Sequence, residues 1–182
     1  YNTTRNISLG TLTLKDLEFY SATGYDSYQL NLTGTVAVLG DLNFNRFSGG
    51  APGSIYGGTL NVSGNITSNT NYYGSMLVRA IGSTSQTISG TTTSAYIPNL
   101  VIASTGGTVS VSGSLGIYQS LTYTSGTVSF GTSTVTLAGA YNASYTLNLA
   151  SLNFYNLTFL SECARDQVTF TITGSLNVGG DL

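Results

Sequence analysis

The chain alternates small polar and apolar residues in short runs along most of its length. TLTL at 11–14, TVAV at 35–38 and TLNV at 59–62 place every second residue on an apolar side. A period of two is typical of a β-strand with one face turned inward. No long stretch shows a period of 3.6, and the helix formers Glu, Lys and Gln are scarce. The pattern therefore predicts an all-β protein.

Three sequence blocks recur in the same order in the second half of the chain. IGSTSQTISG begins at Ile81, and FGTSTVTLAG begins at Phe130, which is 130 − 81 = 49 residues later. IPNLVIAS (97–104) and GTVSVSGSL (107–115) follow the first block, FYNLTFLS (154–161) and VTFTITGSL (168–176) follow the second, and a weaker copy lies at 14–42. Repetition of this kind predicts one repeat domain, 1–182, with units at roughly 11–80, 81–129 and 130–182.

A shorter pattern, apolar-x-apolar-x-Gly-x-apolar, begins at Val36, Leu60, Val109 and Phe170. Val36 and Leu60 are 60 − 36 = 24 residues apart, and Leu60 and Val109 are 109 − 60 = 49 apart. A period of about 25 residues is what the stacked coils of a β-solenoid produce. We therefore expect a β-solenoid (β-helix) of about seven coils that stack ~4.8 Å apart.

A β-sandwich of pilin-like type, with strand exchange between subunits, is the alternative fold. Its alternating strands and its Gly or Ser turns would look the same locally, but the conserved order of the blocks favours the solenoid. Two segments depart from the regular period. One is an eight-residue excess at 143–150, and the other is FSGGAPGSIYGG at 47–58, which we expect to be an inserted loop.

The repeated blocks resemble the units of secreted prokaryotic adhesin-like β-solenoid proteins, which read roughly GTSTVTL-G, then FYNLT, then GTV-V-G-L. FYNLTF at 154–159 is the best single match, and the resemblance covers most of the chain from Leu14 onward. Such proteins act as surface stalks, adhesins or matrix components, so the resemblance implies a role at the cell surface. The family pattern has no catalytic residues to carry over.

Charged residues are unusually scarce in this chain. Five Lys or Arg and seven Asp or Glu amount to 7% of the residues, against roughly 25% in ordinary soluble proteins. Binding to nucleic acid requires clustered Lys and Arg, so we expect no nucleic-acid partner. No run of about 18 apolar residues is present, and we expect no membrane span.

The residues that carry enzyme chemistry are also few. The chain has no histidine, which removes Ser-His-Asp triads and imidazole metal sites. Asp16 and Glu18 are the best carboxylate pair, because with Leu17 and Phe19 inward both would face solvent, as in a solenoid polysaccharide lyase. Charges on an exposed strand more commonly keep an edge soluble. We therefore expect no enzyme activity, no catalytic residue and no cofactor.

The segment ECARDQ at 162–167 holds several residue types that are rare in this chain. Glu162 and Asp166, with backbone carbonyls, are a conceivable calcium site, but a polar loop between two strands is the simpler interpretation. We therefore assign no metal site. Cys163 is the single cysteine, so it is compatible with an intermolecular disulfide or with a small buried side chain.

Seven Asn-x-Ser/Thr sequons are a mild excess over the number that this composition produces by chance. At Asn61, Asn65 and Asn156 the middle residue is apolar, which predicts that the Asn faces outward on a strand there. If they are glycosylated, the protein is extracellular. The candidates are Asn2, Asn6, Asn31, Asn61, Asn65, Asn142 and Asn156.

The leading functional hypothesis is a structural subunit of an extracellular filament, sheath or surface layer. Both ends of the sequence are strand-like and lack capping features, so we expect head-to-tail assembly by β-strand addition, with copies of itself or with further repeats of a longer chain. The candidate subunit contacts are Ile7, Leu9, Leu12, Leu14, Leu176, Val178 and Leu182.

The alternative function is a carbohydrate-binding adhesin or a stalk module of a larger surface protein. It is motivated by the 13 tyrosines, because aromatic faces stack on sugars. Tyr72, Tyr73, Tyr118 and Tyr123 discriminate between the two hypotheses. The adhesin requires them to line one exposed groove, and the structural protein requires them to fill stacked interior positions.

Overall fold

The computed structural model describes residues 3–21, 28–46, 53–140, 142–150, 152–161 and 167–182, and this part of the chain contains strands and no helix. The first strands are β1 (Thr3–Leu14), β2 (Leu17–Ser21), β3 (Tyr28–Val38), β4 (Leu42–Arg46), β5 (Gly53–Tyr56), β6 (Thr59–Val62), β7 (Ile66–Ser68), β8 (Tyr72–Tyr73) and β9 (Leu77–Ala80). The others are β10 (Gln86–Ser129), β11 (Thr134–Gly139), β12 (Ser144–Asn148), β13 (Asn153–Phe154), β14 (Asn156–Ser161), β15 (Thr169–Thr173) and β16 (Asn177–Val178).

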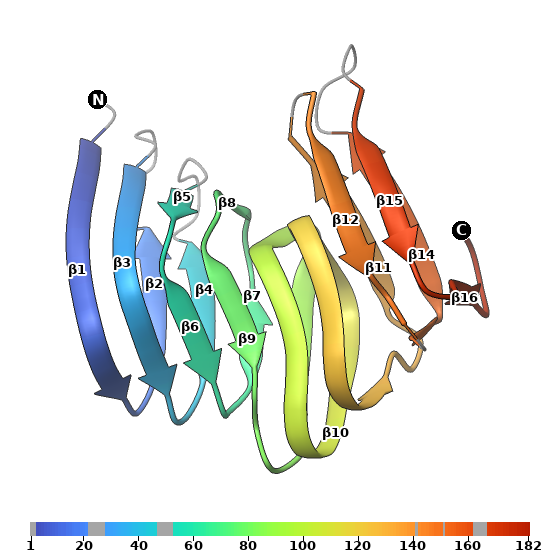
Figure 1. Ribbon diagram of the computed structural model, residues 1–182, viewed down its shortest axis with the longest axis horizontal. Coiled ribbons are helices and arrows are strands. Elements are labelled where there is room, and N and C mark those ends of the chain that lie inside the picture. Colours follow the sequence, from blue (N-terminus) through green and yellow to red (C-terminus); the bar gives the residue numbers. More distant parts are fainter. Residues whose placement is uncertain (1–2, 22–27, 47–52, 141, 151, 162–166) are drawn as a thin grey trace.

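The strands wind into a β-solenoid of about six turns, close to the predicted number. β1, β3, β6 and β9 lie side by side along one face, and β2, β4 and β7 lie behind them (Figure 1). The two marked ends of the chain lie at opposite ends of the long axis in that view. Every strand pair that the structure describes is parallel, whereas sandwiches are built from antiparallel sheets. The β-sandwich alternative is therefore wrong.

The apolar positions of the alternating pattern stack in columns from rung to rung, where a rung is one turn of the solenoid. Leu12 pairs with Val36, Val36 with Leu60, Leu60 with Val78, and Val78 with Leu100. The last four of these side chains are at most 1% exposed. Burying one such side chain stabilises the fold by about 1.5–3 kcal/mol, so the column is the main source of cohesion between rungs.

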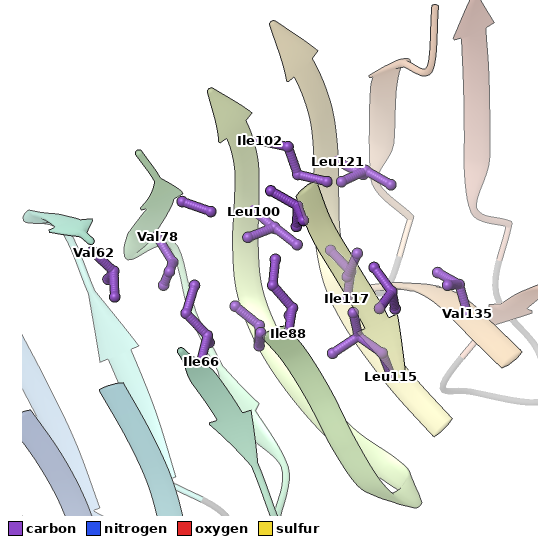
Figure 2. Close-up of a cluster of buried hydrophobic side chains, with 14 of the residues drawn as sticks. Val62, Ile66, Val78, Ile88, Leu100, Ile102, Leu115, Ile117, Leu121 and Val135 are labelled. Carbon is purple, nitrogen blue, oxygen red and sulfur yellow. The ribbon is translucent and has the colours of Figure 1, made fainter. Parts of the chain in front are cut away.

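The core fills the space between the two faces along the solenoid axis. Side chains from the front face, such as Val78 and Leu100, point toward side chains from the back face, such as Ile66 and Ile88 (Figure 2). All four are at most 1% exposed. Aromatic rings extend this core, since Phe19 and Phe44 stack with ring centroids 5.5 Å apart and Phe130 and Phe154 lie 4.4 Å apart.

A stacked pair of glycines bends the front face. Gly10 in β1 pairs with Gly34 in β3, at the point where the register of the two strands shifts. Both have positive φ, +56° and +96°, and a Cβ on Gly34 would lie 2.4 Å from the carbonyl oxygen of Gly10. Only glycine adopts this conformation without strain and allows the backbones to approach so closely. These two residues therefore fix the position of the bulge within the β1–β3 pair.

The two irregular segments of the sequence both contribute strands. Part of the predicted loop at 47–58 is β5, which pairs with β3 and β8, so the loop prediction is wrong there; residues 47–52 lie outside the described part. The excess at 143–150 contains β12, which pairs with β10 and β15. This added strand places the block at 154–161 in β14, against β11, while its counterpart at 97–104 pairs with β9.

Candidate functional site

A ladder of Asp and Asn side chains runs along the corner where the front strands turn into the back strands. The N–H of Asp41 donates to Oδ1 of Asp16 (2.9 Å), and the N–H of Asn65 donates to Oδ1 of Asp41 (2.7 Å). The N–H of Thr87 donates to Oδ1 of Asn65 at 2.8 Å. Each side chain therefore satisfies a backbone donor of the next rung. We call this series the Asx ladder.

Glycine precedes the Asx residue where the next rung is tightly stacked. A Cβ on Gly40 would lie 2.1 Å from Oδ1 of Asp16, and a Cβ on Gly64 would lie 2.7 Å from Oδ1 of Asp41. Real Cβ atoms do not make contacts this short. The glycine is required because the Asx side chain and a backbone carbonyl of the preceding rung occupy the space that a Cβ would fill.

The same corner geometry returns at the other end of the solenoid. The N–H of Asp181 donates to Oδ1 of Asn156 (2.8 Å), and the N–H of Gly180 donates to the carbonyl of Tyr155 (2.7 Å). A Cβ on Gly180 would lie 2.3 Å from Oδ1 of Asn156. The pair Gly180–Asp181 therefore sits on Tyr155–Asn156 as Gly40–Asp41 sits on Lys15–Asp16.

Between these two stretches the corner is filled by other polar side chains. Gln86 is 2% exposed; its Nε2 donates to the carbonyl oxygens of Val62 (3.1 Å) and Gly64 (2.7 Å), and its Oε1 accepts from the N–H of Gly82 (2.7 Å). Ser104 continues the series one rung later, donating to the carbonyl of Gly82 at 2.9 Å. The backbone groups of this corner are therefore hydrogen-bonded by different side chains at different points along the axis.

The inner side chains of the first and last described rungs are exposed or half-buried, whereas most of those between them are buried. Ile7 and Leu12 are each 40% exposed, whereas Leu32 and Val36, which pair with them in the next rung, are 4% and 1% exposed. At the other end, Leu182 is 77% exposed. The remaining predicted contact residues, which are partly buried and packed against the core, are Leu9, Leu14, Leu176 and Val178.

One of the four discriminating tyrosines is buried, and the other three are half-buried. Tyr72 is fully buried, and its hydroxyl donates to the carbonyls of Phe19 (3.2 Å) and Asn45 (3.0 Å). Tyr73 and Tyr118 are half-buried and pack edge to face with ring centroids 4.6 Å apart. Tyr123 is half-buried, and its hydroxyl donates to the carbonyl of Gly126 at 2.6 Å.

The two carboxylates of the predicted pair are both exposed, and each accepts a hydrogen bond from the next rung. Asp16 accepts from Asp41 as part of the Asx ladder, and Oε1 of Glu18 accepts from Nδ2 of Asn45 at 2.5 Å. Their inward neighbours Leu17 and Phe19 pack against the core, as the alternation predicts. Both acids therefore have structural hydrogen bonds across rungs.

The structure does not describe the residues of the conceivable calcium site or the single cysteine. Glu162, Cys163 and Asp166 lie outside the described residues, as does Asn2. No group of three or more His, Cys, Asp or Glu that could hold a metal ion occurs among the described residues, and no helix found there is long and apolar enough to cross a membrane.

The described sequon asparagines differ in exposure. The residues that follow Asn61, Asn65 and Asn156 are buried, so these three lie on the outer side of the alternation. Asn65 is exposed there, whereas the other two are half-buried, and Oδ1 of Asn61 is buried. Of the remaining sequons, Asn6 and Asn142 are exposed and Asn31 is half-buried.

Sequence reasoning missed the Asx ladder as a set. The repeated Gly-Asp/Asn-apolar triplets at 40–42, 64–66 and 180–182 were the signal that could have located it.

Comparison with family models, with curated proteins and with solved structures finds no match to this chain. The β-solenoid implied by the sequence resemblance is confirmed by the structure, and its secreted, adhesin-like character stays a prediction.

Proposed function

We propose that this chain is a structural β-solenoid module of an extracellular or cell-surface assembly, joined to further rungs by β-strand addition. The observation that carries the proposal is the contrast between exposed or half-buried inner side chains in the first and last described rungs and buried ones between them. Leu12 is 40% exposed, and the side chains stacked on it from Val36 onward are at most 1% exposed. An added rung would bury the exposed row in the same way.

The positions of the tyrosines support a structural role over a sugar-binding one. Tyr72 lies in the interior, and Tyr73 and Tyr118 use their rings to pack against each other. A saccharide-binding platform needs ring faces that are open to a ligand. The packing of these three rings therefore supports the structural role, and a glycan panel should show no binding that depends on Tyr73 or Tyr118.

The extracellular location is part of the proposal and is supported by the sequons and the low charge. Asn6, Asn65 and Asn142 are exposed, so an oligosaccharide at any of them would meet no core packing. Expression through the secretory pathway of a eukaryotic host, followed by intact-mass measurement, tests whether these sites accept a glycan. A single unmodified mass would argue against this part of the proposal.

The assembly role is tested by adding rungs to the full chain. A second copy of residues 43–90, appended after Leu182, should lengthen the particle at constant cross-section in small-angle X-ray scattering, because each rung adds ~4.8 Å along the axis. The control is an appended segment of the same composition in scrambled order, which should scatter as a flexible tail. If both extensions behave as flexible tails, the end rung does not accept further rungs and the proposal fails.

A further inference from the structure

We infer that the rung that adds to the C-terminal end of this solenoid is one with a tight corner of the form x-Gly-Asp/Asn, and that a second copy of this chain, through its own first rung, is not that partner. This inference rests on the proposed function, because it specifies which rung the described end accepts. Its starting point is the carboxylate of Asp181, which stands on Asn156 as Asp41 stands on Asp16 in the Asx ladder.

Asp181 is placed to receive a backbone donor from the next rung. Its own N–H is used by Asn156, and its carbonyl accepts from the N–H of Leu157 at 3.0 Å. Asp41 has the same pair of backbone contacts, with Asp16 and with Leu17, and its Oδ1 then accepts from Asn65. By this equivalence, Oδ1 of Asp181 accepts from the residue that occupies the position of Asn65.

The residue before that donor has little room for a side chain. Over Asp16, Asp41 and Asn156 the position is occupied by Gly40, Gly64 and Gly180, and a Cβ there would come within 2.1, 2.7 and 2.3 Å of the Asx oxygen. Over Asn65 no tight corner forms. The chain there takes the longer path 81–87 and fills the space with the buried side chain of Gln86.

The first rung of this chain lacks the glycine. Its corner consists of Lys15 and Asp16, one residue shorter than the corner 39–41 that stacks on it. The matching short corner, Tyr155–Asn156, lies on the backbone carbonyl of Ser133, which accepts from the N–H of Asn156 at 3.2 Å. The two short corners of this structure therefore begin an Asx ladder, the glycine corners at Gly40, Gly64 and Gly180 continue one, and the longer corner 81–87 ends one. Lys15 placed over Asp181 would bring its Cβ against the carboxylate.

The test uses the full chain extended after Leu182 by a second copy of residues 43–90. Leu182 corresponds to Leu42, so the appended Gly64 and Asn65 stand over Gly180 and Asp181 as the native ones stand over Gly40 and Asp41. We expect the appended Asn65 amide to exchange at least about tenfold more slowly than in the extended chain that carries Gly64→Ala in the appended copy only. Ser63→Ala in the appended copy is the matched control and should leave the protection unchanged.

A second pair of variants addresses the acceptor itself. In the extended chain, Asp181→Ala should remove the protection of the appended Asn65 amide, and Asp181→Asn, which keeps Oδ1, should retain it. Neither substitution changes the contacts that the Asp181 backbone makes, so the native rungs should keep their exchange rates. Equal protection in both variants would overturn the role given to the Asp181 side chain.

The outcomes separate this inference from the proposed function. Equal protection with and without the appended Gly64→Ala overturns the inference and leaves the proposed function standing, because rungs still add. Light scattering of the unextended chain gives a second outcome. Polymers that Asp181→Ala abolishes would also overturn the inference and leave the proposed function standing, since a second copy would then be the partner. Appended residues that are unprotected in every version overturn the proposed function as well.

Discussion

The carboxylate of Asp41 accepts a hydrogen bond from the backbone N–H of Asn65, 24 residues further along the chain, at 2.7 Å. Because Asp41 also donates its own N–H to Asp16, it links three successive rungs at one corner. We predict that Asp41→Ala lowers the free energy of unfolding by about 1–2 kcal/mol, since the N–H of Asn65 loses its acceptor. Asp41→Asn keeps the acceptor and should cost less. Urea denaturation followed by circular dichroism measures both, and equal losses would contradict the ladder.

The buried amide of Gln86 satisfies three backbone groups of two rungs. Gln86→Ala should lower the free energy of unfolding by about 3 kcal/mol, because it leaves these groups unpaired and opens a cavity. Gln86→Leu restores much of the volume and isolates the hydrogen-bond part of the loss. The exposed Gln167 provides the control, as Gln167→Ala should change stability by less than about 0.5 kcal/mol.

The hydroxyl of Tyr72 is the polar end of a buried aromatic side chain. Tyr72→Phe keeps the ring against Phe44, 5.2 Å away between centroids, and removes the donor to two carbonyls. We expect a loss of about 1 kcal/mol for this variant and about 3–5 kcal/mol for Tyr72→Ala. Tyr20→Phe, at a residue 53% exposed, should be neutral. A neutral Tyr72→Phe in thermal melts would show that these hydroxyl contacts add no stability.

Two glycines near the ladder should differ in how much stability the protein loses when each is replaced by alanine. Gly64→Ala drives a Cβ to 2.3 Å from the carbonyl oxygen of Gly40 and should destabilise the fold by about 2 kcal/mol. Gly179→Ala meets only the carbonyl oxygen of Phe154, at 3.8 Å, and should be tolerated. Differential scanning calorimetry compares the two, and similar melting temperatures would mean that the corner can open without cost.

Stability should depend little on ionic strength. The chain has five basic and seven acidic residues, so few charge interactions exist for salt to screen, while apolar stacks and backbone ladders join the rungs. The melting temperature is expected to stay nearly constant between low salt and 1 M NaCl. A sharp fall across that range would show that ion pairs contribute more than this composition indicates.

The sequence by itself determined the fold class, because the signals are local. The two-residue alternation in 35–38 and 59–62 decides which side chains face inward, and the glycine turns decide where each strand ends. A recurrence of these units every 24 residues or so then favours a solenoid over a β-sandwich, and the parallel strand pairs of the structure decide between the two. The exposure of Ile7 and Leu12 relative to Leu32 and Val36 follows from the same stacking.

The tertiary structure alone decided which rung lies on which, and with it the corner contacts. The bonds from Asp41 to Asp16 and from Asp181 to Asn156 each span 25 residues, and they form only when neighbouring rungs are in one register. The eight-residue excess shows how the register is set. Because it contains the additional strand β12, the block at 154–161 pairs with β11, whereas its counterpart at 97–104 pairs with β9. Register depends on how whole rungs pack, and a shift by one residue exchanges inner and outer side chains. No local pattern contains that information.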